Sequence, residues 1–382
     1  MTAFELYSLK TQVSSKSPIM IRLHIFLLLL LLCLISNLPQ QARAEYLIES
    51  IAEGLNFPWS LEFLDDQEII ISELGGTLRH IDTEGNVSKP IPGSPTVYRA
   101  GQGGLFDVLR HPNFSENKQI YLSYASGDEE ANATTVARAI WHKTGLTNLE
   151  VIFKATPSKY AALHYGGRLA WLPDNTLLLT TGDGFDFREK AQDRSTHFGK
   201  TIRMNENGGP ARDNPFSEYP FIYSYGHRNP QGLAVSSKGT IYQHEHGPQG
   251  GDEVNIIASG KNYGWPIITY GLDYNGAYVS PFTEMEGMIQ PVHVWTPSIA
   301  PSGLAIYEGD LFPEWQGDLF VGDLNNHHVK RLRLGGSATV ITEETIFTEV
   351  NARVRDVRVS PKGEIYVVTD GENGAIFRVS PK

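Results

Sequence analysis

A short pattern recurs six times along the chain, and it restricts the possible folds more than any other feature. Each copy has a small or polar residue, an alternating apolar stretch, a turn, and a second run rich in β-branched or aromatic residues. The apolar anchors of the copies stand 47, 61, 64, 71 and 53 residues apart, at Leu61, Val108, Leu169, Leu233, Leu304 and Val357. Period-two alternation indicates strands, and almost no segment shows a sustained helical period. The chain is therefore predicted to be all-β.

Six copies of this size predict a six-bladed β-propeller. A four-stranded blade takes about 40–50 residues, and the longer gaps correspond to loop insertions. A pair of β-sandwiches is the alternative, but six copies are too many for one sandwich and no linker separates two halves. The strand expected around 46–51 would complete the last blade and close the ring. Residues 45–382 are accordingly predicted to form one propeller domain.

The composition excludes several classes of protein. Hydrophobic residues make up 41% of the chain, which is enough for a packed core. The formal net charge is -11, which argues against a general affinity for nucleic acid, because such binding depends on neutralising phosphates. Cys33 is the only cysteine, so an intramolecular disulfide and a zinc or iron–sulfur site built from cysteines are excluded.

The first 44 residues have the pattern of a secretory signal peptide. An unbroken apolar run at 25–35 follows Arg22 and precedes a small-residue cleavage site at 42–44. A run of this length rises only about 16 Å as a helix, roughly half a bilayer core, so an uncleaved membrane anchor is the less favoured alternative. Cleavage after Ala44 would release a periplasmic or secreted protein with no stable membrane anchor. Met20 offers a second start site.

Polar residues gather in the long insertions between the predicted strands. The segments at 226–232 and 245–253 combine glycines with a cation, amides and carboxylates, and those at 163–168 and 181–184 add a histidine and an aspartate. An oxygen-rich set of this kind suits Ca²⁺. One such loop alone is more often a tight turn, but a propeller gathers its loops around the axis. Nucleotide-binding loops and the G-x-S-x-G and H-E-x-x-H motifs are absent.

These segments resemble the soluble PQQ-dependent aldose sugar dehydrogenases of the glucose/sorbosone dehydrogenase family. The resemblance covers nearly the whole chain after residue 44, and the matching stretches are 101–105, 164–168, 182–200, 225–232, 246–255, 260–266, 298–304 and 353–357. It implies a six-bladed propeller, in agreement with the repeats. It also implies an oxidoreductase that converts the anomeric carbon of an aldose to a lactone, with hydride transfer to PQQ and electrons passed to an external acceptor.

The resemblance implies roles for individual residues. His164 matches the general base that takes the proton of the anomeric hydroxyl, and Asp183 matches the carboxylate beside it. Arg228 would stabilise the negative charge on the reduced quinone. The positions that match cofactor contacts are Gln102, Arg228, Asn229, Arg353 and Arg355, of which the last two would hold carboxylates of PQQ.

The resemblance also implies calcium. The carbonyl groups of Gly247 and Pro248 match the ligands of a Ca²⁺ ion that polarises the quinone. Glu253 and the carbonyl of Tyr263 match a second, structural Ca²⁺ site.

Asn325 departs from the family pattern. Members of the family usually carry a lysine at this position that reaches a PQQ oxygen, and Lys330 lies five residues further on. The loss of this cation predicts weaker PQQ binding, or a relative that has drifted from PQQ. Two other functions stay open on the same fold: a Ca²⁺-dependent sugar lactonase and a non-catalytic binding propeller. The pair Arg353 and Arg355 favours the quinoprotein, because a lactonase has no need of a carboxylate clamp.

Overall fold

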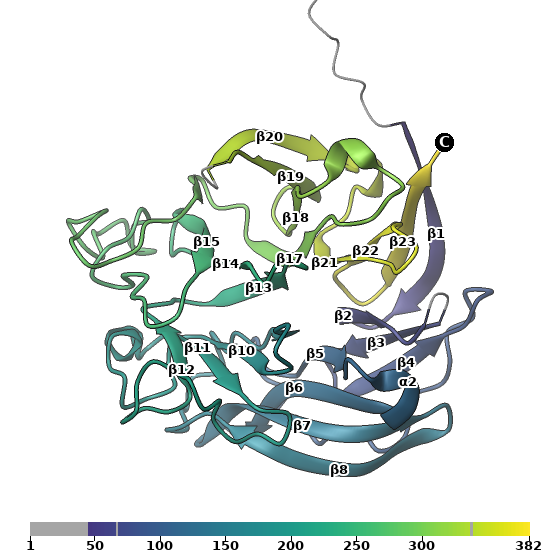
Figure 1. Ribbon diagram of the computed structural model, residues 1–382, viewed down its shortest axis with the longest axis horizontal. Helices are drawn as coiled ribbons and strands as arrows, with labels where there is room; N and C mark the ends of the chain where they lie inside the picture. The colour runs from purple at the N-terminus through teal and green to yellow at the C-terminus, as the bar shows by residue number, and fades with distance from the viewer. Residues whose placement is uncertain (1–44, 66–67, 337–338) are drawn as a thin grey trace, which may run out of the picture. The chain divides into compact units, whose positions relative to one another are not determined.

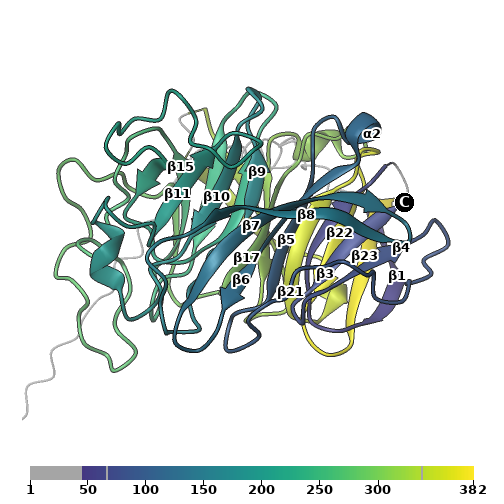
Figure 2. The same ribbon diagram turned by 90° about the horizontal axis from the view of Figure 1, so that it is seen from below.

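The six copies of the sequence pattern form six antiparallel β-sheets in the computed structural model, which describes residues 45–65, 68–336 and 339–382. Figure 1 shows these sheets arranged around a common centre. The view turned by 90° shows strands crossing between two faces, where connecting loops collect (Figure 2). The arrangement is a six-bladed β-propeller, as predicted. The predicted signal peptide at 1–44 lies outside the described residues.

Each blade is a meander of antiparallel strands, three in the first blade and four in the others within the described ranges. The short helical segments of the described residues are α2 (Phe114–Asn117) and three 3₁₀ turns at Arg188–Ala191, Pro313–Trp315 and Thr348–Val350. The first blade contains β2 (Pro58–Phe63), β3 (Ile69–Glu73) and β4 (Thr77–Ile81), and the second contains β5 (Leu105–Arg110), β6 (Gln119–Gly127), β7 (Asn132–His142) and β8 (Gly145–Lys154). The third contains β9 (Leu169–Trp171), β10 (Leu177–Thr181), β11 (Lys200–Met204) and β12 (Ile222–Tyr225), and the fourth contains β13 (Pro230–Val235), β14 (Ile241–Glu245), β15 (Asp252–Ile257) and β16 (His293–Trp295). The fifth contains β17 (Pro301–Ile306), β18 (Leu319–Asp323), β19 (His328–Leu334) and β20 (Val340–Ile346), and the sixth contains β21 (Val354–Val359), β22 (Ile365–Thr369), β23 (Gly374–Pro381) and β1 (Tyr46–Leu55).

The N-terminal strand closes the ring. Strand β1 pairs antiparallel with β23 from the other end of the chain, with Tyr46 opposite Pro381 and Leu47 opposite Ser380. The sixth blade is thus built from both ends of the propeller, which confirms the predicted closure.

The hydrophobic core is divided among the interfaces between neighbouring blades. The six anchor residues lie on the first strand of each blade, and none is more than 4% exposed. In the interface between the first two blades, for example, Leu105 and Val108 pack with Ile70 and Leu78. Because alternate side chains of a strand point to opposite faces, a continuous apolar run such as Ile69–Ile71 on β3 supplies both neighbours of its blade: Ile70 packs toward the second blade, and Ile69 and Ile71 pack toward the sixth.

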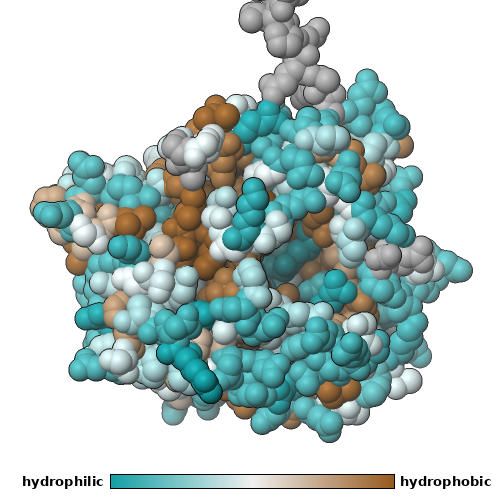
Figure 3. Space-filling view, viewed as in Figure 1, coloured by the Kyte–Doolittle hydropathy of each residue, from teal (hydrophilic) through white to brown (hydrophobic). Residues whose placement is uncertain are grey.

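Charged residues hold the inner strands together near the axis. Asp107, Arg168 and Asp356 each stand just before an anchor and are at most 2% exposed. Arg168 Nη1 lies 3.0 Å from Asp356 Oδ1, and Arg358 reaches Asp356 at 2.8 Å and Asp107 at 2.9 Å. We call these four residues the central ion-pair cluster; they belong to the second, third and sixth blades. The face seen in Figure 1 is hollowed near its centre, and the surface there is hydrophilic (Figure 3).

Candidate active site

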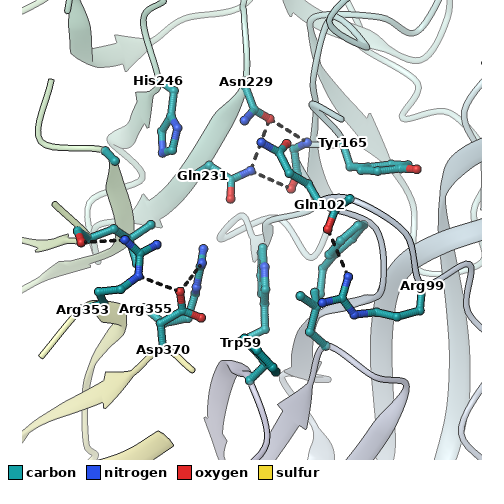
Figure 4. A pocket seen from close by; sticks show the side chains of 17 residues that line it. Trp59, Arg99, Gln102, Tyr165, Asn229, Gln231, His246, Arg353, Arg355 and Asp370 are labelled. Atoms are coloured by element: carbon teal, nitrogen blue, oxygen red, sulfur yellow. Dashed lines mark hydrogen bonds and ion pairs between the residues drawn. The ribbon is translucent and has the colours of Figure 1, made fainter. Parts of the chain in front are cut away.

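Two cavities adjoin the loops that the sequence singled out. The central pocket has a volume of about 330 Å³ and receives residues from all six blades. Figure 4 shows its polar and aromatic walls, which include Trp59, Arg99, Gln102, Tyr165, Asn229, Gln231, His246, Arg353, Arg355 and Asp370. The side pocket has a volume of about 220 Å³, and its lining includes His164, Asp183, Phe185, Arg228, Trp265 and Tyr274.

His164 and Asp183 form a buried hydrogen-bonded pair in the wall of the side pocket. The Nδ1 atom of His164 lies 2.7 Å from Oδ1 of Asp183. The second carboxylate oxygen accepts a 2.7 Å hydrogen bond from the indole N–H of Trp265. The backbone N–H of Asp183 donates to the carbonyl of Arg228 at 2.7 Å, so the loops of two blades fix the carboxylate. The structure therefore brings together the predicted base and its predicted carboxylate.

The carboxylate determines which imidazole nitrogen is free. Because a carboxylate accepts hydrogen bonds, Nδ1 of His164 carries the proton and Nε2 keeps its lone pair. Burial lowers the pKa of His164; Asp183 raises it, whereas Arg228 and Lys159 lower it, and the net pKa lies below the usual value. The side chain is therefore neutral near pH 7, which is the state required of a base.

Gln102 and Asn229 connect the two pockets through the loop that carries His164. The Oε1 atom of Gln102 accepts a 2.8 Å hydrogen bond from the backbone N–H of His164. Asn229 Oδ1 accepts hydrogen bonds from the N–H of Gly166 at 3.2 Å and from Nε2 of Gln231 at 3.3 Å. Both amides line the central pocket, as expected of residues beside a cofactor and the base.

Arg228 lies beside His164 in the side pocket and is 4% exposed. Its Nη1 donates to the carbonyl of Gly247 at 2.6 Å, and its Nη2 donates to the hydroxyl of Tyr274 at 3.1 Å. Within the described ranges it makes no ion pair, so its charge is available to an anionic group. The carbonyl of Gly247, a predicted calcium ligand, has the guanidinium as its partner in this structure.

The guanidinium groups of Arg353 and Arg355 both contact the carboxylate of Asp370. Oδ2 of Asp370 lies 3.2 Å from Nε of Arg353 and 3.1 Å from Nη2 of Arg355. Burial raises the pKa of Asp370, but the two guanidinium groups outweigh it and the pKa lies below the usual value. Two cations against one carboxylate leave a net positive charge. Nε of Arg355 is buried without a hydrogen-bond partner among the described residues, so the predicted clamp retains a donor for an anionic ligand.

The central pocket contains residues outside the stretches that the sequence analysis singled out, and Trp59, Arg99 and Asp370 are among them. The rings of Trp59 and Tyr165 flank that of Phe106, with centroid distances of 5.5 and 5.4 Å. Arg99 donates to the carbonyl groups of Gly101 and Gly103 at 3.1 and 3.2 Å. A cation two residues before the 101–105 motif was the signal that could have identified Arg99. The pocket thus has flat aromatic and cationic walls, which fit a planar polycarboxylate.

The structure does not place Asn325 in the lining of the central pocket. Asn325 lines a groove of about 710 Å³ that shares His246 and Ala300 with the central pocket, whereas its neighbour Leu324 lines the central pocket itself. The cause is local, because the Asn325 side chain donates to the carbonyl of Ser298 at 3.0 Å. Lys330 does not replace it, since its ammonium lies 2.9 Å from Glu343. Of Arg99, Asn325 and Lys330, only Arg99 is a cation that lines the central pocket.

The predicted structural calcium site contains two facing carboxylates. Glu253 on β15 stands directly opposite Glu245 on β14, beside a small cavity of about 10 Å³ that Tyr263 also lines. Burial, followed by the charge of Glu245, raises the pKa of Glu253 to about 8. A cation between the two would relieve this repulsion. No cluster of three or more His, Cys, Asp or Glu side chains suited to a metal occurs in 45–65, 68–336 or 339–382. Pro248 lines the side pocket.

Comparison with known proteins places the chain among sugar dehydrogenases. Residues 55–378 match the family described as Glucose / Sorbosone dehydrogenase. The aldose sugar dehydrogenase YliI of Escherichia coli (strain K12) is 38% identical over 370 residues, which cover 94% of this chain and 98% of that protein. Quinoprotein glucose dehydrogenase B of Acinetobacter calcoaceticus is 27% identical over 405 residues, with 84% of each protein covered.

A solved structure extends the similarity to the fold. The PQQ-bound form of an aldose sugar dehydrogenase from Streptomyces coelicolor superposes with a TM-score of 0.75 at 28% identity, covering 89% of this chain and 99% of that one. No helix among the described residues is long and apolar enough to cross a membrane.

Proposed function

The chain belongs to the glucose/sorbosone dehydrogenase family, and on this premise we propose that it is a quinoprotein that oxidises the anomeric carbon of aldose sugars to the lactone. Family membership makes it an oxidoreductase acting on sugars. The dependence on PQQ, the lactone product and an external electron acceptor are the parts that we propose. The observation that carries the proposal is the buried hydrogen-bonded pair of His164 and Asp183 in a polar pocket, beside a second pocket with aromatic and cationic walls.

The residues of the side pocket supply the proton chemistry. His164 accepts the proton of the anomeric hydroxyl at Nε2 while the carbonyl of the lactone forms. Asp183 stabilises the resulting imidazolium through its 2.7 Å contact with Nδ1. Trp265 donates to the other oxygen of Asp183 and keeps the carboxylate oriented toward His164.

The residues of the central pocket fit the cofactor. When bound, PQQ supplies the quinone carbon that accepts the hydride from the sugar. Arg353 and Arg355 would hold its carboxylates, since the planar guanidinium fork matches a carboxylate and Nε of Arg355 lacks a partner among the described residues. Trp59 and Tyr165 contribute aromatic carbon to the lining of this pocket. From the side pocket, Arg228, which makes no ion pair within the described residues, would stabilise negative charge on the reduced quinone.

Reconstitution tests the proposal. Protein purified without cofactor should gain dye-reducing activity with a panel of aldoses after addition of PQQ and Ca²⁺. The matched variant His164→Ala should still bind PQQ, measured by fluorescence titration, while turnover at saturating PQQ falls about 10²–10⁴-fold. Tight PQQ binding without oxidation of any aldose would contradict the assigned reaction, and absence of PQQ binding would contradict the assigned cofactor.

We also propose two Ca²⁺ ions. One would be bound by the carbonyl groups of Gly247 and Pro248, and it requires Arg228 to release the Gly247 carbonyl that it contacts at 2.6 Å. The other would lie at Glu253 and Tyr263, where the facing carboxylate of Glu245 favours a cation. Chelation should then abolish activity and also lower the melting temperature of the PQQ-free protein. An unchanged melting temperature would remove the second ion from the proposal.

Export is the last part of the proposal. The apolar run at 25–35 and the small-residue site at 42–44 support cleavage after Ala44 and a periplasmic or secreted location. Mass spectrometry of the mature protein should find Glu45 as its first residue. A mature chain that retains the apolar run would contradict this assignment.

A further inference from the structure

Lys159 is a buried lysine close to the base. It is 4% exposed and forms no ion pair among the described residues. Its backbone N–H and C=O pair with the backbone of Asn132 on β7, both at 2.8 Å. The start of the loop that leads to His164 is therefore fixed to the second blade. Burying an ammonium without a carboxylate partner is costly, so its remaining contacts require an explanation.

The ammonium of Lys159 turns back beneath its own loop. It donates to the carbonyl of Leu163 at 2.7 Å and to the carbonyl of Ala161. It also lies 3.6 Å from the centroid of the Tyr165 ring, a cation–π contact. Two carbonyl groups and one aromatic face use all three N–H groups of the ammonium.

These contacts fix the peptide that joins Leu163 to His164. Its carbonyl is held by Lys159, and its N–H donates to Oε1 of Gln102 at 2.8 Å. His164 itself has a φ of +49°, in the left-handed region that residues other than glycine adopt only when their surroundings hold them there. We propose that Lys159 is a positioning residue, which holds the Leu163–His164 peptide so that the imidazole meets both Asp183 and the side pocket.

Lys159 also packs against the segment that carries Asp183. A Cβ atom at Gly184 would lie 2.8 Å from Cδ of Lys159, so the lysine stem lies directly against the residue that follows Asp183. Lys159 therefore contacts the segment that carries His164 and the segment that carries Asp183, and it couples the positions of these two residues. This role rests on the proposed function of His164 as the base, but the geometry of the pair does not depend on the cofactor.

The charge of Lys159 acts on the base as well. Burial lowers the pKa of Lys159 to about 7, while Asp183 and Asp186 raise it. Burial lowers the pKa of His164, Asp183 raises it, and Arg228 and Lys159 lower it. His246 is a further titratable group near the base, since His164 lowers its pKa. Removing the ammonium of Lys159 should therefore raise the pKa of His164.

Lys200 provides a matched control. It is fully buried, and its ammonium donates to three carbonyl groups, those of Lys190 at 2.9 Å, Ala191 at 3.0 Å and Phe198. Burial lowers its pKa to about 7, as for Lys159. The charge of Lys200 lowers the pKa of a different histidine, His197. The two lysines thus have the same chemistry but act on two different imidazoles.

The experiment compares Lys159→Met with Lys200→Met in the PQQ-free protein. Imidazole titrations by NMR, assigned with His164→Ala and His197→Ala, should show the His164 midpoint at higher pH in Lys159→Met and the His197 midpoint at higher pH in Lys200→Met. With saturating PQQ, Lys159→Met should lose up to about 10²-fold in turnover, the cost of a small misplacement of a catalytic group, with PQQ affinity unchanged. If the His164 midpoint and the turnover of Lys159→Met match those of Lys200→Met, the positioning role is wrong.

Lys159→Gln separates the two effects and replaces the methionine variant if that one does not fold. Its amide can still donate to the carbonyl groups but carries no charge. It should restore much of the turnover while the His164 midpoint stays raised. If the turnover of Lys159→Gln is no higher than that of Lys159→Met, which has no donor, positioning by hydrogen bonds is contradicted. A moved His164 midpoint in a protein that oxidises no sugar would instead contradict the proposed function and leave the role of Lys159 intact.

Discussion

Replacing Arg168 by methionine tests the central ion-pair cluster. The substitution keeps an apolar stem of similar length and removes the guanidinium, which lies 3.0 Å from Asp356 and donates to the carbonyl of Gln231 at 2.7 Å. It also removes the cation 4.0 Å above the ring of Trp59. Because Trp59 lines the central pocket, the loss should affect both the stability of the ring and the wall of the pocket.

The size of the effect follows from the burial of the pair. Arg168 and Asp356 are at most 2% exposed, and removing one partner of such a pair typically costs about 3–5 kcal/mol. An unfolding entropy of about 2.1 cal/mol/K per residue corresponds to roughly 0.7 kcal/mol/K for a propeller of this length, so the melting temperature should fall by about 4–7 °C. Thermal unfolding of the PQQ-free protein, followed by circular dichroism, measures this change.

Arg378→Met is the control. Its guanidinium lies 2.7 Å from Glu49, but both side chains are exposed, and such pairs contribute about 0–1 kcal/mol. The melting temperature of the Arg378→Met variant should be lower than that of the unsubstituted protein by no more than about 1 °C. Equal effects of the two substitutions, or a loss below about 1 °C for Arg168→Met, would refute the reasoning that the central cluster holds the inner strands together.

Four further predictions concern the two pockets and the groove beside them. Asp183→Asn should lower turnover at saturating PQQ by about 10²-fold or more, because the imidazolium of His164 loses its carboxylate; steady-state dye reduction measures this. Since the pKa of His164 is lowered, the base stays unprotonated to lower pH, and the acid limb of kcat/KM should lie below pH 6.5; a limb above that value would contradict the burial of the base. Arg355→Gln should weaken PQQ binding about 10–100-fold, as expected for a lost charge-assisted contact, and Arg99→Gln should weaken it in the same direction. Asn325→Lys should leave PQQ affinity unchanged in the same fluorescence titration, since Asn325 is not among the residues that line the central pocket.

The fold could be predicted from the sequence because the strand pattern is local and recurs six times along the chain. Leu61 and Val357 mark strands by period-two alternation, and the buried inner strand of each blade needs apolar residues at those positions. The closing strand was also predictable, since one blade of a ring must join the chain ends. The three-stranded first blade was not, because its outer edge is a single bridge between Ile81 and Val87 that carries no strand pattern.

The site was predictable only in part. The pair His164 and Asp183 was predicted from motifs that resemble a known family. The spacing of the two residues in the sequence does not by itself indicate that they are in contact. Trp59 and Asp370 were missed because each is a single residue whose role depends on which loops converge at the axis. The orientation of Asn325 depends on one hydrogen bond to a backbone carbonyl, which sequence patterns do not encode.

The closure of the sixth blade by β1 and β23 makes the position of the chain ends arbitrary. The N–H of Lys382 donates to the carbonyl of Glu45 at 3.2 Å, so the first and last residues of the ring are already in contact. A circular permutant, with these ends joined by a short linker and the chain opened between two other blades, would retain every strand pairing. Since β1 starts at Tyr46, proteolysis much beyond residue 45 would remove hydrogen bonds from the β1–β23 pairing. Within the described residues this pairing joins the two ends of the propeller, so a force that pulls residues 45 and 382 apart would act on it directly.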